Sequence, residues 1–509
     1  MSHSPPSQVK KHLNGITLLC LAFVICNSWA GIAGSLQLAI LAGGPATLVY
    51  SIIVAATAYL AIAASMAELA AVYPTAGGQY HIASILAPER WRQGVSYTCG
   101  LLALFSWLVI GVSVTSIAAQ QLMALVATSL SDFVPQPWHI FFVYQGLALF
   151  AIIYNTFFLK KNPWTHNVAF ILTISLFFVC FILLLVRGNP KQSHGFVWST
   201  FLNYTGWPGG VCFLIGLTTS CYMFNGLDGA MHMAEESSNP ERVVPRTMLG
   251  AVGIGFTTGF AYAVAQVYAI SDIEEVMTTM QWVPFVVMEQ GFRSRTIAIV
   301  IVSISIVMAM TIIIATQEAS SRLAWALARD KGLLFSQYIE HIHPYLEVPI
   351  RSLLLIWVLT FICGFLYLAS QTAFNAIIGS SVILQQLSFG IPILLIIARK
   401  RSTAYLSPAR SFRMPNILGW VVNIYAVAFI TLMAVILCLP VTNPTSALTM
   451  NYTCVILGFC LLLALANWWL YAKDHYNGPV IETWESYEAE PASVSTILSQ
   501  TKKVNEGTA

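Results

Sequence analysis

The sequence predicts an all-α integral membrane protein with twelve transmembrane helices, and three observations support this prediction. Only 9% of the 509 residues are charged and 57% are hydrophobic, with a mean hydropathy of +0.73, whereas soluble domains carry about 25% charged residues. Long stretches of the chain contain no Asp, Glu, Lys or Arg at all. Twelve spans also gather the basic residues on one side of the membrane, as the positive-inside rule requires.

The charge-free stretches, divided at turn signals, give the individual spans, because a helix needs about 20 apolar residues to cross a bilayer. The first stretch, 14–67, holds two helices that are divided at 42–46. The last, 414–472, holds two helices that are divided at LPVTNPTSAL. The other spans are expected over 93–131, 133–159, 162–186, about 210–233, about 247–270 and about 296–319, with two more in 352–398.

The basic residues predict the orientation. With the N-terminus in the cytoplasm, 20 of the 24 Lys and Arg residues fall on the inner side, and the outer side receives only Arg187, Lys191, Arg293 and Arg295. We therefore expect cytoplasmic tails at 1–13 and 474–509. The motif NYT places candidate glycosylation acceptors at Asn203 and Asn451, both on expected outer segments.

Helix-weakening residues interrupt the first and sixth expected helices. The stretch NSWAGIAGSL contains Gly31 and Gly34, and MFNGLDGAMHMAEE contains Asn225 and Gly226. A broken helix in lipid is tolerated where it lines a protein or water cavity, although glycines also permit close helix packing. The two segments occupy corresponding places in two five-helix halves, which is typical of transporters built from inverted repeats.

Asp228 is an acidic residue inside the sixth expected span. A carboxylate near the middle of a membrane is costly and is therefore a candidate functional group. It could attract a substrate ammonium, take part in proton coupling or cap a half-helix. The alternative is that Asp228 lies close enough to the cytoplasmic edge to be solvated.

Two further segments carry a resemblance to a known family. They are ELAAVYPTAGG, which begins at Glu68, and SRLAWALARDKGL, which begins at Ser321. Both resemble signatures of the amino acid–polyamine–organocation (APC) superfamily, and GLDGAMHMAEE is similar to its fungal GABA, choline and amino acid permease branch. The resemblance implies a LeuT-like 5+5 inverted repeat plus two C-terminal helices. The transporter domain would be 14–473, with repeat one at about 14–187, repeat two at about 208–398 and helices 11–12 at about 414–472.

The resemblance also implies a substrate site at the two interruptions. Members bind the substrate carboxylate on the first helix and its amine on carbonyls of the first and sixth helices. The implied residues are Trp29, Ala30, Gly31, Ile32, Ala33, Gly34, Phe224, Asn225, Gly226 and Asp228. Phe224 would close the outer side of the site. Trp29 either faces the cavity, where it could stack on a quaternary ammonium, or packs against lipid or core.

Charged residues at the inner side suggest a gate. We hypothesise that Glu68 pairs with Arg322 when the protein is open to the outside, because an acidic residue at an apolar helix end needs a partner. The alternative is that both residues contact water or lipid headgroups. His166 and His232 can titrate near neutral pH, and we expect both at the solvent-exposed cytoplasmic edge.

The expected function is that of a secondary active transporter, not an enzyme. It would import a small amino compound, such as GABA or another amino acid, across a fungal plasma membrane by alternating access, and family analogy favours proton symport. The alternatives are transport of choline, ethanolamine or a polyamine, or a nutrient sensor that does not transport. We expect no cofactor, no metal and no nucleic-acid partner; the partners are the substrate, H⁺ and the lipid bilayer.

Overall fold

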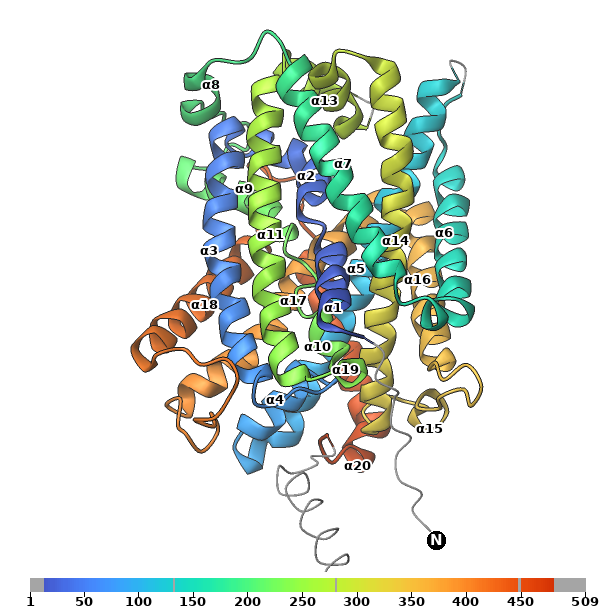
Figure 1. Ribbon diagram of the computed structural model, residues 1–509, viewed down its shortest axis with the longest axis vertical. Helices are drawn as coiled ribbons and strands as arrows, with labels where there is room; N and C mark the ends of the chain where they lie inside the picture. Colours follow the sequence, from blue (N-terminus) through green and yellow to red (C-terminus); the bar gives the residue numbers. More distant parts are fainter. Residues whose placement is uncertain (1–12, 131–132, 280–281, 447–449, 480–509) are drawn as a thin grey trace, which may run out of the picture.

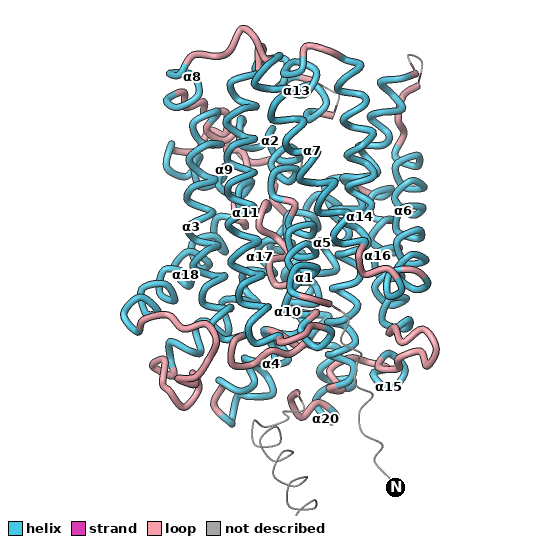
Figure 2. The backbone as a smooth tube through the Cα atoms, in the orientation of Figure 1, coloured by secondary structure: helices cyan, strands magenta, loops and turns pink. Residues whose placement is uncertain are grey.

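The computed structural model describes residues 13–130, 133–279, 282–446 and 450–479, with only the backbone described at 33–35, 37, 160, 371–373 and 375. Almost the whole expected N-terminal tail and most of the C-terminal tail lie outside these ranges. Over the described ranges the chain is helical, with two isolated β-bridges and no longer strand. The helices stand side by side in one bundle (Figures 1 and 2). The predicted all-α membrane class is confirmed.

Eleven helical segments of the described chain are long and apolar enough to cross a membrane. The first predicted span consists of α1 (Gly15–Cys26) and α2 (Ser28–Leu41). The other long helices are α3 (Gly44–Ala70), α5 (Arg92–Ser129), α6 (Pro137–Phe157), α7 (Thr165–Arg187), α11 (Pro240–Ala269), α14 (Arg295–Arg329), α16 (Ile350–Ala369), α17 (Gln371–Ala398), α18 (Asn416–Ile436) and α19 (Thr453–Asn467).

The sixth predicted span does not contain a single helix that is long enough to be identified as membrane-spanning. It consists of α9 (Gly209–Tyr222), a turn and α10 (Gly229–His232), so neither helix alone is long enough to span a bilayer. The shorter connecting helices are α4 (Gln79–Leu86), α8 (His194–Ser199), α12 (Ile273–Thr278), α13 (Val283–Phe292), α15 (Ser336–Ile339) and α20 (Lys473–His475), with the 3₁₀ turns Glu89–Trp91, Leu159–Lys161 and Ala234–Glu236 and the π-helical turn Trp468–Ala472.

Two helices extend well beyond their predicted ends. α11 starts at Pro240 rather than at 247, and α14 continues to Arg329 rather than ending at 319. Hydropathy marks only the charge-free part of a helix, and both extensions contain charged residues. Pro240 suits the first turn of α11, where its missing N–H costs nothing.

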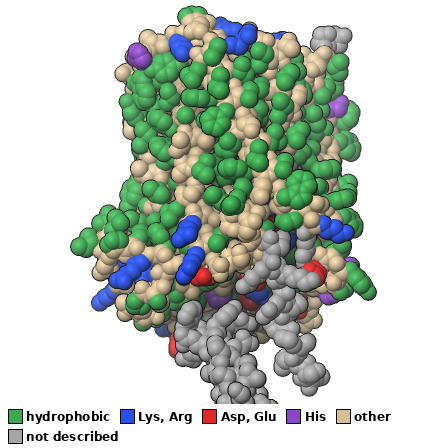
Figure 3. All heavy atoms as spheres, in the orientation of Figure 1, with side chains coloured by type: hydrophobic (Ala, Val, Ile, Leu, Met, Phe, Trp, Pro, Cys, Tyr) green, Lys and Arg blue, Asp and Glu red, His purple; other side chains and the backbone are tan. Residues whose placement is uncertain are grey.

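The described part of the bundle has two distinct ends. The end that bears the start of α1 also carries α4, α15 and α20, and we call it the N-terminal face; α8 and α13 lie at the opposite face (Figure 1). α5 packs against α14, α17 and α4, and α3 packs along α11. On the side shown in Figure 3, hydrophobic side chains cover the middle and Lys and Arg gather toward the two ends. This distribution matches a lipid-facing belt.

Candidate functional site

The first helix breaks at Asn27. This residue has φ 35° and ψ 53°, in the left-handed region, and it ends α1 and precedes α2. The prediction of a break at Gly31 and Gly34 is therefore wrong in position, because both glycines lie within α2. Asn visits the left-handed region more readily than most residues, since its short polar side chain bonds locally, so the break did not need a glycine.

The second break is where the sequence predicts it. The turn between α9 and α10 covers residues 223–228, and Gly226 adopts φ +86°. The two breaks contact each other, because the Ser28 hydroxyl donates a 2.8 Å hydrogen bond to the Met223 carbonyl oxygen. Residues distant in sequence thus meet at one place inside the bundle, where helix ends leave backbone groups without intrahelical partners.

A cavity of about 110 Å³ lies beside these two breaks. It is lined by Ile25, Cys26, Asn27, Trp29, Ala30, Gly31, Ile110, Val114, Ile117, Gln121, Tyr222, Asn225, Trp282, Met288, Ile301, Ser305, Met308, Ala309 and Ile312. None of these described lining residues is Asp, Glu, Lys or Arg. α5 contributes residues toward its C-terminal end and α14 contributes its first half, so the cavity lies toward the face opposite the N-terminal face.

Three buried side-chain polar atoms of the lining have no partner among the described residues, namely Oδ1 of Asn27, Oδ1 of Asn225 and the indole Nε1 of Trp29. Asn27 and Asn225 are buried, at 3% and 5% exposure. Their Oδ1 atoms accept no hydrogen bond from any described residue. Their amide nitrogens are engaged, that of Asn27 with the Met308 sulfur at 3.5 Å and that of Asn225 with the Ser381 hydroxyl at 3.0 Å. Because an unpaired buried acceptor costs free energy, the two oxygens mark a place for a donor or a cation.

The predicted substrate residues divide into three groups. Trp29, Ala30, Gly31 and Asn225 line the cavity. Trp29 also packs at 5.1 Å from the Tyr262 ring, so the two alternatives for this residue both hold in part. Ile32, Phe224, Gly226 and Asp228 do not belong to the lining, and Ala33 and Gly34 are described only as α2 backbone.

Phe224 does not occupy the place that the resemblance implies. Its ring stacks on Tyr59, with 5.1 Å between the ring centroids, and it is buried in the main core. Tyr222, two residues earlier, lines the cavity instead. The turn after α9 changes the helical phase here, so sequence position alone did not predict which aromatic faces the cavity.

The lining from α5 and α14 was missed by sequence reasoning. The α5 residues Ile110, Val114, Ile117 and Gln121 follow one another at spacings of four, three and four, which places them on one helix face. Such a stripe is the same whether it faces a cavity or a packed core, so sequence alone offers no signal to separate the two. Sequence reasoning also missed Trp282, which precedes α13, and Met288 within α13.

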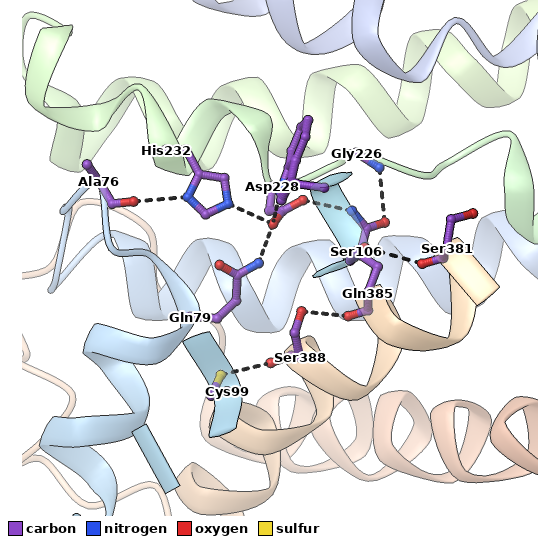
Figure 4. A network of polar contacts seen from close by, with 11 residues as sticks. Ala76, Gln79, Cys99, Ser106, Gly226, Asp228, His232, Ser381, Gln385 and Ser388 are labelled. Atoms are coloured by element: carbon purple, nitrogen blue, oxygen red, sulfur yellow. Dashed lines mark hydrogen bonds and ion pairs between the residues drawn. The ribbon is translucent and has the colours of Figure 1, made fainter. Parts of the chain in front are cut away.

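Asp228 is held by four partners, of which Figure 4 labels Gln79, His232 and Gln385. Its Oδ2 atom accepts hydrogen bonds from the side-chain amide of Gln79 and from the Trp107 indole at 3.0 Å, and lies 3.0 Å from His232 Nε2. Its Oδ1 atom accepts from the Gln385 amide at 2.9 Å. At 1% exposure the carboxylate is buried, so solvation at the cytoplasmic edge does not explain it.

His232 is buried as well, and the expectation of a solvent-exposed histidine is wrong. Its side chain is fully enclosed, and its Nδ1 atom lies 2.9 Å from the Ala76 carbonyl oxygen in the α3–α4 connection. His166 is also buried, with Nε2 3.1 Å from Glu318 Oε2. Both histidines start or end helices, but neighbouring helices cover those ends.

The predicted Glu68–Arg322 pair is wrong. Glu68 is buried and pairs with Arg401 at 2.7 Å and Arg410 at 2.6 Å. Arg322 pairs instead with Glu236 at 2.6 Å. The sequence predicts that all these residues lie on the inner side of the membrane. Charge and side alone do not determine which arginine pairs with Glu68. These buried ion pairs between side chains join helix ends at the described N-terminal face and close it.

The two candidate glycosylation acceptors differ in their surroundings. Asn203 is exposed, and its Oδ1 accepts hydrogen bonds from the Thr205 N–H and hydroxyl at 3.0 and 2.8 Å. Asn451 is half-buried, and its amide donates to the Leu437 and Leu439 carbonyls at 2.8 and 3.0 Å. If either residue is modified, the geometry favours Asn203.

A bundle of apolar helices with two touching breaks and a cavity beside them defines a multi-span membrane transporter. Comparison with known proteins gives the family. The family model for amino acid permeases matches residues 16–460, so the chain belongs to the amino acid permease family of the APC superfamily. This family consists of transporters rather than enzymes.

Curated relatives cover nearly the whole chain. The chain is 32% identical to a choline transporter of Saccharomyces cerevisiae over 95% of its own length and 85% of the relative's. It is 29% identical to amino-acid permease 2 of Neurospora crassa over 90% and 85%. It is 28% identical to the swainsonine transporter of Arthroderma benhamiae over 92% and 93%. The protein is therefore a membrane transporter for an amino-type substrate.

Proposed function

We propose that this permease imports a small organic ammonium compound, and that a choline-like quaternary ammonium fits best. The observation that carries the proposal is the cavity itself, which combines two unpartnered amide oxygens, from Asn27 and Asn225, with walls free of charged side chains. Oxygen dipoles and aromatic rings can stabilise a cation without a carboxylate. The similarity to the yeast choline transporter supports the same substrate class.

The aromatic residues of the lining support a quaternary ammonium. Trp29, Tyr222 and Trp282 contribute to the cavity wall, and a cation over such a ring gains about 0.5 to 2 kcal/mol. A polyamine fits less well, because several positive charges in a cavity without acidic groups would lack partners. Ethanolamine shares the hydroxyl and the single positive charge of choline and is expected to compete with it.

An amino acid such as GABA is the second candidate. The N-terminus of α2, which begins at Ser28 beside the cavity, presents amide N–H groups and the positive end of a helix dipole. This arrangement suits a substrate carboxylate, while the amide oxygens of Asn27 and Asn225 accept from the ammonium. The similarity to the fungal amino-acid permease supports this alternative.

The transport cycle that we propose is alternating access with proton symport. The first helix of each proposed five-helix repeat, about 14–187 and 208–398, carries one of the two breaks, so relative movement of the repeats would expose the cavity to either side. We assign the N-terminal face to the cytoplasm from the distribution of Lys and Arg, and we place the protein in the plasma membrane.

Uptake in transporter-deficient yeast tests the substrate. Cells that express the chain receive labelled choline, GABA, spermidine or a neutral amino acid mixture, with and without a protonophore. We expect choline uptake that collapses with the protonophore. Uptake of GABA alone would select the second candidate. Surface-expressed protein that takes up none of the four would contradict transport of an ammonium compound and favour a sensor.

Trp282 variants test the role of the aromatic wall in the same assay. Trp282→Leu removes the π face and should raise KM for choline roughly 5- to 30-fold, the equivalent of 1–2 kcal/mol. Trp282→Phe keeps a ring and should stay close to the parent protein. Equal KM values for the two variants would contradict recognition of the cation by this ring.

A further inference from the structure

Both ring nitrogens of His232 lie within hydrogen-bond distance of an oxygen atom. Nδ1 lies 2.9 Å from the Ala76 carbonyl oxygen, which can only accept, so Nδ1 carries a hydrogen. Nε2 lies 3.0 Å from Asp228 Oδ2. A contact of this length between a ring nitrogen and a carboxyl oxygen also needs a hydrogen between them. Both contacts are satisfied together only when the pair holds one proton more than a carboxylate beside a neutral ring.

The other partners of Asp228 place that proton on the ring. Gln79, Trp107 and Gln385 each offer an N–H to the carboxylate, and N–H donors favour the ionised form of a carboxyl group. A proton on this pair would let the His232 ring donate from both nitrogens, to the Ala76 carbonyl and to the Asp228 carboxylate. The result would be a buried ion pair inside a membrane helix bundle, where an ionisable group is functional by default.

We infer that Asp228 and His232 form the site of the coupling proton, and that this proton fastens the α3–α4 connection to the second helix break. This inference rests on the proposed proton symport. The proton links three elements, because Asp228 precedes α10, His232 ends it, and Ala76 belongs to the connection between α3 and α4. Without the proton, a ring lone pair would face either the Asp228 carboxylate or the Ala76 carbonyl oxygen, and that contact would be repulsive.

Gln385 connects the proton site to the cavity. Its Nε2 donates to Asp228 Oδ1 at 2.9 Å, and its Oε1 accepts the Gly226 N–H at 3.0 Å (Figure 4). The residue before Gly226 is Asn225, whose unpartnered oxygen lines the cavity. A change of charge on Asp228 would therefore act through the Gln385 side-chain amide on the backbone next to Asn225, which lines the cavity.

The remaining titratable groups near the pair have their own surroundings. Cys26 of α1 and Cys99 of α5 interact electrostatically with Asp228 and are buried. On the N-terminal side, Glu235 and Glu236 are matched by Arg329 and Arg322. His81 of α4 lies near Arg329 and Glu235. Asp228 and His232 themselves contact each other, between the helix breaks and the N-terminal face.

Transport in proteoliposomes tests the coupling role. Two activities are compared for each variant, namely exchange of labelled for unlabelled choline at equal pH and accumulation driven by an inward proton gradient. For Asp228→Asn and His232→Gln we expect accumulation to fall at least tenfold while exchange persists. The control His475→Gln changes an exposed histidine of the N-terminal face and should behave as the parent. Unimpaired accumulation in both variants would overturn the inference.

A second readout does not depend on symport. Solid-state ¹⁵N NMR of the histidine-labelled full chain in lipid, with the H232Q spectrum subtracted, reports the protonation of the ring at neutral pH. Two protonated ring nitrogens support the proton site, and a neutral ring overturns it. If the parent protein exchanges choline but does not respond to the gradient, the proposed symport fails and the coupling role fails with it, whatever the NMR result. If the parent does not exchange choline, the NMR result alone decides whether the proton is present.

Discussion

Glu68 shows how a single buried charge closes the N-terminal face. Its carboxylate contacts the Arg401 and Arg410 guanidiniums and accepts the Met414 N–H at 3.0 Å. A lone buried carboxylate would be very costly, but a charge with several matched donors is tolerated. The group therefore joins the end of α3 to the α17–α18 connection.

Removing this charge should destabilise the protein far more than removing an exposed one. Glu68→Gln leaves two buried arginines without their anion, which typically costs about 3–5 kcal/mol. Glu340→Gln is the matched control, because its pair with Lys331 is about one-third exposed on both sides and such pairs contribute about 0–1 kcal/mol. Thermal unfolding in detergent, followed by size-exclusion chromatography, measures both. Equal midpoints for the two variants would count against this role of Glu68.

His81 predicts a pH dependence of stability. Burial, aided by the positive charge of Arg329, lowers the pKa of His81 from 6.5 to about 4. Between these values the unfolded chain binds a proton that the folded protein does not, so stability should fall as pH drops from about 6.5 toward 4. A shift of this size corresponds to roughly 3 kcal/mol at most.

The same unfolding assay at pH 7 and pH 5 measures this effect. We expect the midpoint to drop on acidification, and His81→Gln to reduce the drop because the titrating group is gone. The exposed His475→Gln should leave the drop as it is. A drop that is unchanged by His81→Gln would show that other groups control acid stability.

At the scale of elements, the second break fits closely against α1. A Cβ atom on Gly226 would lie 2.4 Å from Ile25 Cγ2, and one on Gly229 would lie 2.8 Å from Ile25 Cδ1 and 3.2 Å from the Trp107 ring. Gly226 also needs its positive φ, which other residues rarely adopt. Glycines at this place let the two broken helices touch. They therefore allow both close packing and the break in the helix.

This fit gives a prediction with its own control. Gly229→Ala and Gly226→Ala should each strongly reduce uptake. Adding Ile25→Val removes Cδ1 but keeps Cγ2, so it should partly restore Gly229→Ala and leave Gly226→Ala inactive. Uptake and surface expression of the two double variants are the measurement. Restoration of both, or of neither, would mean that the contacts with Ile25 do not decide the outcome.

Sequence reasoning predicted the elements better than the contacts between them. Hydropathy located the long helices, and the glycines of GLDG located the second break. The first break was misplaced because Asn27 can adopt a left-handed conformation that pattern rules assign to glycine. The partners of Glu68 and the cavity face of α5 depend on how helices rotate and pack, which periodicity does not specify.

At the scale of the whole molecule, the two faces differ. Buried ion pairs and the Asp228 group close the N-terminal face, and the cavity lies toward the opposite one. If the basic N-terminal face is cytoplasmic, this arrangement is the closed-inside stage of an alternating-access cycle. The orientation of the N-terminal face therefore determines which stage of the cycle this structure represents.

Cysteine labelling tests the orientation. Lys191→Cys and Tyr345→Cys are introduced singly into a Cys454→Ser background, since Cys454 is exposed. Lys191 lies near α8 at the opposite face, and Tyr345 lies between α15 and α16 at the N-terminal face. A membrane-impermeant maleimide should label the first in intact cells and the second only after permeabilisation. The reverse pattern would contradict a cytoplasmic N-terminal face.

We propose that an ammonium substrate binds at the two touching breaks, and equilibrium binding of labelled choline to the purified protein tests this proposal. Asn27→Gly removes the unpartnered oxygen but keeps the left-handed backbone, and Asn239→Gly is the matched control, because Asn239 is also left-handed (φ 51°) but starts α11 at the N-terminal face. We predict a Kd about tenfold higher for Asn27→Gly, because about 1.4 kcal/mol of attraction between the cation and the amide dipole would be lost, and an unchanged Kd for Asn239→Gly. Equal affinity in the parent protein and both variants would contradict the proposal.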